Sequence, residues 1–124
     1  MLYKFPKEKK LLKSREFKNV LDSGAKFILP ELIIFSKPSD LESSRMGLIV
    51  TKKVGNAVIR NKIKRRLREV FRLSKTFDEG ELPALDLVFI ARQKAITASY
   101  EKLTSSYEFA LKHVTRRHSK TKKL

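Results

Sequence analysis

Cationic side chains gather in one stretch of the chain, residues 51–72, which reads TKKVGNAVIRNKIKRRLREVFR. Four of them recur every fourth position: Arg60, Lys64, Arg68 and Arg72. On a helix these residues would line one edge, where like charges repel each other and weaken the helix in isolation. Binding to a polyanion would neutralise this repulsion, so the pattern favours a nucleic-acid contact. An ordinary solvated face is the alternative, but surface helices usually mix charges, and Glu69 is the only acid here.

The helix that would carry these cations is predicted for residues 56–74, with Asn56 as its N-cap. Apolar residues recur at helical spacing and predict one buried stripe: Ile59, Ile63, Leu67, Val70 and Phe71. Lys52 and Lys53 lie shortly before Gly55 and the cap. Two cations beside a helix N-terminus form a site suited to an anion.

A second group of candidate binding residues follows or faces the predicted strands. Arg92 and Lys94 leave the end of a buried strand, which we expect to reach the same sheet edge as Lys52 and Lys53. Phe17 and Phe35 offer aromatic faces on which unpaired bases could stack. Core packing is the alternative for both phenylalanines, and a solvated strand end is the alternative for each cation.

The side-chain sets of a self-sufficient catalyst are missing from the sequence. A metal-dependent nuclease needs clustered acids or histidines, but the acids here are scattered. His113 and His118 have no nearby acid to orient them, and the chain has no cysteine and no glycine-rich phosphate loop. The residues alone therefore indicate a binding protein, with a stand-alone nuclease as a disfavoured alternative.

Composition limits the possible partners. The chain has 124 residues, enough for a single domain, and 29 Lys and Arg against 13 Asp and Glu give a formal net charge of +16. A small domain this basic has RNA, DNA or an anionic membrane surface as plausible partners. No run is long enough to span a bilayer, the N-terminus lacks a signal-peptide core, and the absence of cysteine suits a reducing compartment. We expect a cytoplasmic protein that does not bind membranes.

The remaining elements follow from periodicity and turn residues. Ser14 is a candidate N-cap for a short helix that ends near Gly24 and buries Phe17, Val20 and Leu21. Strands are predicted at residues 25–29, 32–35, 46–51 and 86–91, and the acidic segment 75–83 is predicted to be a loop. A last helix begins at Thr97 or Ser99 and buries a stripe with Phe109 on its far side.

The order of these elements is αβββαβα, with helices packed against one mostly antiparallel four-stranded sheet. We expect strands 32–35 and 46–51 to pair antiparallel through a polar hairpin loop, and strand 86–91 to be a parallel neighbour of an earlier strand. Neither candidate cap of the last helix, Thr97 or Ser99, has Glu or Gln at the third helical position, so no capping box is expected there. Residues 1–9 and 117–124 are predicted to be mobile basic arms of this single RNA-binding domain.

The stretch 51–72 closely resembles the signature of the bacterial ribonuclease P protein subunit, roughly S/T-K-K-x-G-x-A-V-x-R-N-R-x-K-R-x-x-R. The matching positions are Thr51, Lys52, Lys53, Gly55, Ala57, Val58, Arg60, Asn61, Lys64, Arg65 and Arg68. LKSREFKNVLDSGAKF and VFIARQKA resemble flanking parts of the same family, and the likeness covers about residues 10–114. The sequence departs from the pattern at Lys62 (usually Arg), at Leu21 (an aromatic expected) and at Gln93 (often a cation).

The resemblance implies a fold and a role. The fold would be an αβββαβα two-layer sandwich of the ribosomal protein S5 domain 2-like kind, with a left-handed crossover through the basic helix, against the usual right-handed rule. The chain would be a subunit of a ribonucleoprotein endonuclease that removes the 5′ leader of precursor tRNA. An RNA subunit would hold the catalytic Mg²⁺ and perform the cleavage, so the isolated protein would not be catalytic.

The resemblance also assigns residues to two surfaces. Binding to the RNA subunit would use Arg60, Asn61, Lys62, Lys64, Arg65 and Arg68. Binding to the leader would use Phe17, Phe35, Lys52, Lys53 and Arg92, in a groove between the first helix and the sheet. Stacking and charge suit a single strand of varied sequence. A general RNA-binding or ribosomal protein of the same fold is the alternative, and a membrane-surface helix is a more distant one.

Overall fold

The computed structural model describes residues 10–11, 13–41, 44–74 and 84–122, with side chains described as far as His113. The predicted arm 1–9 and the predicted acidic loop 75–83 lie outside the described residues. The elements follow the predicted order αβββαβα, with one additional 3₁₀ turn, η2. Their bounds are α1 Ser14–Ser23, β1 Ala25–Ile28, β2 Leu32–Pro38, β3 Arg45–Ile49, α2 Ala57–Arg72, β4 Leu85–Ala91, η2 Gln93–Ala95 and α3 Tyr100–Lys122.

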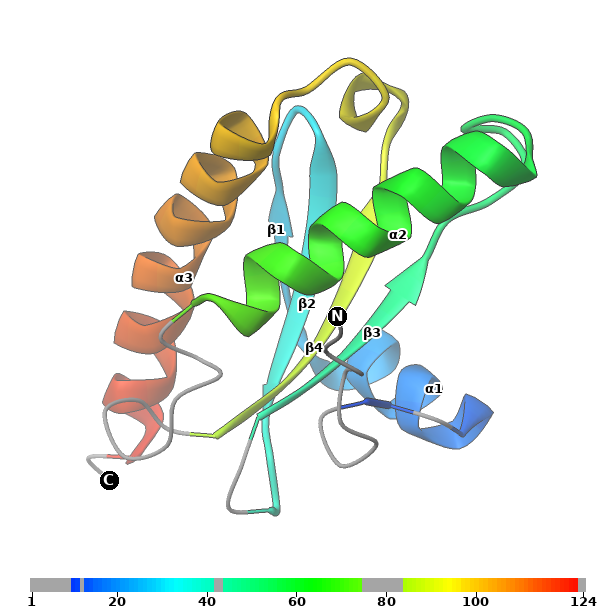
Figure 1. The fold of residues 1–124 in the computed structure, drawn as a ribbon. Coiled ribbons are helices and arrows are strands. Elements are labelled where there is room, and N and C mark those ends of the chain that lie inside the picture. Colours follow the sequence, from blue (N-terminus) through cyan, green and yellow to red (C-terminus); the bar gives the residue numbers. More distant parts are fainter. Residues whose placement is uncertain (1–9, 12, 42–43, 75–83, 123–124) are drawn as a thin grey trace.

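The sheet has the strand order β1-β2-β4-β3 (Figure 1). β3 and β4 are parallel, with Ile49 opposite Ile90, which confirms the predicted parallel neighbour. The predicted hairpin of β2 with β3 is wrong, because β4 lies between them and pairs antiparallel with β2. β4 takes this central place because it is apolar on both faces, with Leu87, Val88 and Phe89 all buried. The hand of the β3–α2–β4 crossover stays a prediction.

Two helices cover one face of the sheet, and α1 lies against the other (Figure 1). The main core lies between the sheet and the pair α2 and α3. Its largest fully buried side chains include Leu67, Phe71, Phe89 and Tyr107, and the Phe89 and Tyr107 rings are 5.2 Å apart. A smaller apolar cluster forms on the α1 side. Its buried members are Leu11, Val20 and Val88, and its partly buried members are Phe17, Leu21, Phe35, Ile49 and Ile90.

The helix starts show how well the capping residues were predicted. Asn56 caps α2, since its side chain accepts a hydrogen bond from the Ile59 amide at 3.0 Å. Ser99 Oγ likewise accepts from the Lys102 amide at the start of α3. The cap of α1 is Lys13 and not Ser14, so Glu16 occupies the third helical position and accepts from the Lys13 amide at 2.9 Å. Glu16 thus supplies the acidic half of a capping box at α1.

Two other boundaries differ from the sequence prediction. β2 continues through Lys37 to Pro38, where it pairs with Leu85 of β4 instead of ending after Phe35. Proline is tolerated there because it is the last residue of the strand. α3 continues to Lys122, so most of the basic tail is helical. Leu11 contacts the body of the protein, because its amide donates to Met46 O at 3.1 Å.

Candidate nucleic-acid interface

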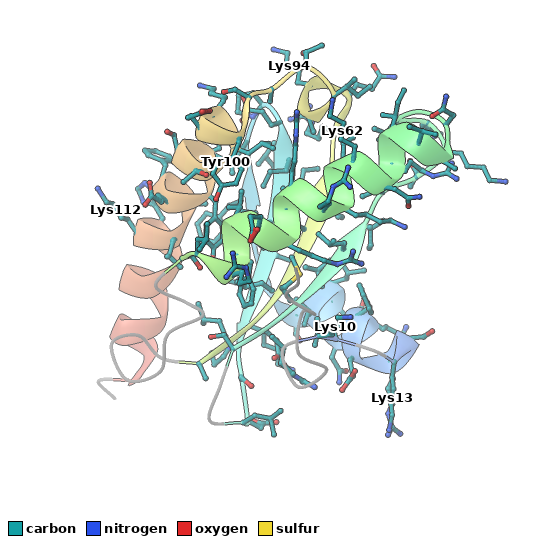
Figure 2. All side chains as sticks on the ribbon, viewed as in Figure 1. Lys10, Lys13, Lys62, Lys94, Tyr100 and Lys112 are labelled. Atoms are coloured by element: carbon teal, nitrogen blue, oxygen red, sulfur yellow. The ribbon has the colours of Figure 1, made fainter. Side chains whose placement is uncertain are left out.

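The outward side of α2 carries a row of exposed polar and cationic residues, which we call the α2 basic face. The predicted apolar stripe points to the sheet, with Ile63, Leu67, Val70 and Phe71 buried and Ile59 packed against the core. Burial of this stripe turns the rest of the helix surface to solvent, where Lys62 can be followed in Figure 2. The exposed residues of the α2 basic face are Asn61, Lys62, Arg65 and Arg68.

Two predicted RNA-binding residues, Arg60 and Lys64, are half-buried at the edge of this face. Arg60 Nη1 donates a hydrogen bond to Gly55 O at 3.2 Å, which holds its guanidinium beside the helix start. Two further arginines of α2 bind to the protein itself. Arg66 donates to Ala98 O at 3.1 Å, and Arg72 forms an ion pair with Glu69. Among the polar residues of α2, those available to a ligand are therefore mainly the residues of the α2 basic face.

The ends of the parallel strands β3 and β4 bring the other predicted cations to one sheet edge. Lys52 and Lys53 are exposed in the turn between β3 and α2, and Gln93 Nε2 donates to Lys53 O at 3.4 Å. Arg92 and Lys94 follow β4 and are exposed as well. The predicted convergence of these two cationic segments at one edge is confirmed.

Arg92 is held at this edge by the neighbouring strand connection. Its Nη1 donates to Leu29 O at 2.8 Å, between β1 and β2. The guanidinium lies beside a depression of about 610 Å³, lined by Ile28, Leu29, Pro30, Arg92, Gln93 and Lys94. Ile28 is 62% exposed, so an apolar surface adjoins the cations. This combination suits a single strand, whose phosphates and bases need both kinds of contact.

Between α1 and the sheet lies a shallow depression of about 410 Å³, which we call the α1 groove. It is lined by Ser14, Phe17, Lys18, Leu21, Asp22 and Ile49. Phe17 and Leu21 are only partly buried, because α1 covers only part of the sheet. Phe17 thus packs in the smaller apolar cluster while part of its ring stays accessible. The two readings of Phe17, core residue and stacking surface, are compatible.

Phe35 lies on the same face of the sheet, in the same apolar cluster, and is half-buried. It pairs across β2 and β4 with Val88 and across β1 and β2 with Lys26. Lys26 Nζ lies 5.7 Å from the centroid of the Phe35 ring, a cation–π distance. Lys26 was not among the predicted site residues. Lys26 is the second residue of β1, and the register of β1 with β2 places it opposite Phe35. Its contact with Phe35 could have been predicted only if that register had been known.

A third hollow, of about 320 Å³, joins the α1 side to α2 around the outer edge of β3. It is lined by Lys10, Leu11, Phe17, Met46, Gly47, Leu48, Lys64 and Arg68. Phe17 lines both this hollow and the α1 groove, so the two predicted surfaces meet at Phe17. Sequence reasoning missed Lys10 and Gly47 here, because the short bridge of Lys10 to Met46 has no sequence signal.

The described residues contain no group of three or more His, Cys, Asp or Glu side chains that could hold a metal ion. Among the same residues, no helix combines the length and the apolar character needed to cross a membrane. The exposed cations and the partly accessible aromatic rings described above suit the binding of anions and of unpaired bases.

Comparison with known proteins gives the family. A family model described as Ribonuclease P matches residues 5–115. The chain belongs to this family. The Ribonuclease P protein component of Dehalococcoides mccartyi is 42% identical over 105 residues, which are 85% of this chain and 80% of that protein. That of Petrotoga mobilis is 41% identical over 91 residues, which are 73% of this chain and 74% of that protein.

Solved ribonuclease P proteins share the fold. The Staphylococcus aureus RNase P protein superposes with a TM-score of 0.74 at 31% identity, covering 86% of this chain and 97% of that one. The Thermotoga maritima RNase P protein superposes with a TM-score of 0.69 at 27% identity, covering 86% and 96%. The ribonuclease P fold of this chain was therefore predicted correctly from its signature stretch.

Proposed function

We propose that this chain is the protein subunit of ribonuclease P and binds both the catalytic RNA subunit and the 5′ leader of precursor tRNA. Membership of the ribonuclease P protein family supports the subunit role. The observation that carries the RNA-binding part is the α2 basic face. Its side chains point away from the core, and Lys62, Arg65 and Arg68 make no ion pair with any described acid.

The RNA subunit would dock on α2. Cations on a rigid helix can each approach a backbone phosphate, and the planar guanidinium of Arg65 or Arg68 can contact two phosphate oxygens at once. Asn61 adds a hydrogen-bonding side chain to the same surface. Arg60 and Lys64, which are half-buried, would contribute at the edge of the contact.

The leader would lie on the opposite face of the sheet, in the α1 groove. Phe17 and Phe35 supply aromatic surface on that face, while Lys52, Lys53 and Arg92 supply charge at the adjoining sheet edge. Stacking and phosphate contacts recognise a single strand without reading its bases. This fits a leader whose sequence differs from one precursor tRNA to another.

Catalysis would belong to the RNA subunit, which would also hold most of the Mg²⁺ needed to cut the leader. The protein would act by binding and orienting the substrate, and we place this work in the cytoplasm. Its +16 charge would also offset part of the repulsion between two RNA molecules.

Reconstitution with a bacterial ribonuclease P RNA tests the proposal. At low Mg²⁺ and physiological salt, adding the protein should increase both the cleavage of precursor tRNA and the affinity for it. The protein purified free of RNA should cleave nothing. The absence of any gain on reconstitution, or cleavage by the protein alone, would overturn the proposal.

A further inference from the structure

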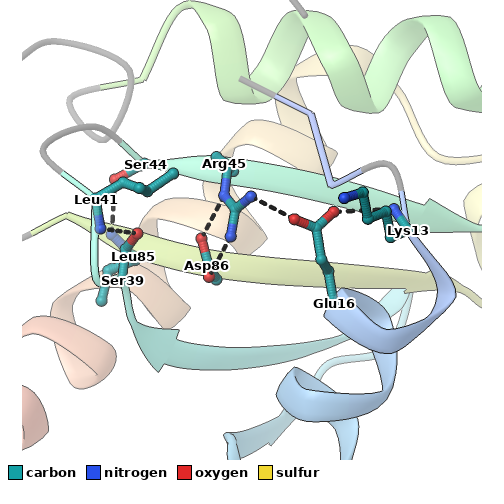
Figure 3. A network of polar contacts seen from close by, with 8 residues as sticks. All are labelled: Lys13, Glu16, Ser39, Leu41, Ser44, Arg45, Leu85 and Asp86. Atoms are coloured by element: carbon teal, nitrogen blue, oxygen red, sulfur yellow. Dashed lines mark hydrogen bonds and ion pairs between the residues drawn. The ribbon is translucent and has the colours of Figure 1, made fainter. Parts of the chain in front are cut away.

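Three charged side chains from three elements meet beside the first turn of α1 (Figure 3). Arg45, the first residue of β3, donates to Asp86 of β4 through Nε to Oδ1 at 3.0 Å and Nη2 to Oδ2 at 2.9 Å. Its remaining Nη1 donates to Glu16 Oε2 of α1 at 2.7 Å. We call Glu16, Arg45 and Asp86 the Arg45 clamp.

The planar geometry of the guanidinium makes the contact of Arg45 with Asp86 directional. Arg45 and Asp86 are register partners in the parallel pair β3 and β4, so their fork-to-fork contact lies across two neighbouring strands. The pKa of the Arg45 guanidinium is raised, mainly by the hydrogen bond to Asp86. The side chains of Arg45, Glu16 and Asp86 are 17%, 23% and 13% exposed, so solvent screens them only weakly.

The other carboxylate oxygen of Glu16 accepts a second hydrogen bond. Oε1 accepts from the Lys13 amide at 2.9 Å and so closes the first turn of α1 (Figure 3). The same carboxylate therefore caps the helix and ties it to β3. The first turn of α1 cannot shift along the sheet without breaking one of these contacts.

The clamp lies next to Phe17, which lines the α1 groove, and next to Gly47, which lines the neighbouring hollow. Phe17 directly follows Glu16, and Gly47 lies two residues after Arg45 on the same face of β3. Phe17 packs against Gly47 so closely that a Cβ added there would stand 2.5 Å from its ring. The position of the clamp on both elements therefore sets where the accessible part of Phe17 lies.

We infer that Glu16, Arg45 and Asp86 are positioning residues for the single-stranded leader: they fix α1 on the sheet so that Phe17 is presented to a base. None of the three would contact the strand. The inference rests on the proposed function. Stability alone is a weak reason for such a cluster, because replacing a shielded ion pair by apolar side chains is often neutral or stabilising.

Glu16→Gln is the sharpest test, because it breaks the link to α1 and leaves Arg45 paired with Asp86. An amide must then present its NH₂ group either to Arg45 or to the Lys13 amide, each of which is a donor. Glu108→Gln is the matched control, with the same chemical change at an exposed position of α3, on the other face of the sheet. Both variants would be reconstituted with a bacterial ribonuclease P RNA.

The measured quantity is the ratio of affinities for precursor tRNA with and without its leader. We expect Glu16→Gln to lower this ratio by about fivefold, the low end of what one stacked base contributes. Affinity for the RNA subunit and for leaderless tRNA should not change. Glu108→Gln should match the wild type in the leader ratio and in both of these affinities. Hydrogen exchange should rise in α1 of Glu16→Gln, with α3 unaffected.

An unchanged leader ratio in Glu16→Gln would overturn the inference, as would a parallel loss of all three affinities, which would indicate a purely structural role. If the wild type itself shows no gain from the leader, the proposed leader site fails and the clamp's role with it. Should Glu16→Gln fold poorly, Arg45→Lys keeps the charge and loses the fork. A leader ratio lowered in folded Arg45→Lys would support the inference, and an unchanged ratio would overturn it.

Discussion

The ring of Phe17 lies against the backbone of Gly47, where no other residue type fits without a shift. A Cβ added to Gly47 would stand 2.5 Å from both Cε1 and Cζ of Phe17 and 3.3 Å from Cβ of Leu11. The glycine is needed here for this close approach of a helix to a strand. Because Gly47 has no side chain, α1 can approach the sheet closely enough for Phe17 to line two hollows.

Gly47→Ala should therefore displace Phe17 and loosen α1. Overpacking of this kind destabilises a fold by about 1–3 kcal/mol, measurable as a lower midpoint of urea unfolding. The affinity for the leader should fall as well, because the ring moves. Full stability combined with wild-type leader affinity would show that α1 adapts and that the close approach is unimportant.

Phe17→Leu separates the aromatic surface from the packing. Leucine can fill most of the apolar cluster but offers no flat face for a base. Each stacked base contributes about 1–3 kcal/mol, so leader affinity should fall at least about fivefold while unfolding changes little. Phe109→Leu is the control, because Phe109 is 60% exposed on α3, across the sheet from α1. Equal effects of the two substitutions would contradict a leader contact at Phe17.

Removing two cations from the α2 basic face should weaken binding to the RNA subunit and flatten its salt dependence. Arg65→Ala with Arg68→Ala removes two phosphate contacts, each of which contributes about 0.7–0.9 to the slope of log K against log salt. Lys102→Ala with Lys112→Ala is the control, with the same loss of charge from exposed positions of α3. If both pairs change the slope equally, the effect is one of net charge and α2 has no special role.

Asn56→Ala should destabilise the protein by about 1 kcal/mol, because the Ile59 amide loses its acceptor at the start of α2. Asn56→Ser keeps a side-chain oxygen at the cap and should cost much less. Chemical unfolding of the two variants and the wild type measures the difference. Equal losses in the two variants would show that the capping bond contributes little to stability.

The sequence predicted α2 well because several independent signals agree there. The cap at Asn56, the apolar stripe through Leu67 and the charge on the opposite side all belong to one helix. The parallel pairing of β3 and β4 was also predictable, since a strand, a helix and a strand in succession usually form such a pair. In each case the information lies within single elements and in their order along the chain.

The order of strands was not predictable in the same way. A short polar connection between β2 and β3 favours a hairpin, and only the greater burial of β4 decides against it. The α1 cap was misplaced by one residue, because Ser14 is a typical N-cap and Lys13 is not. Because of this shift Glu16 was not recognised as part of the cap, and the Arg45 clamp was missed with it. The members of the clamp lie up to 70 positions apart, from Glu16 to Asp86.

The central place of β4 governs how the chain can fold as it leaves the ribosome. β1 and β2 can form a hairpin early, but β4, residues 85–91, is the only named strand that pairs with β3 in the described part of the chain. A nascent chain that stops before residue 85 should therefore not unfold cooperatively. Its cationic segment, residues 51–72, would be exposed to cellular RNA before the core covers the apolar side of that segment.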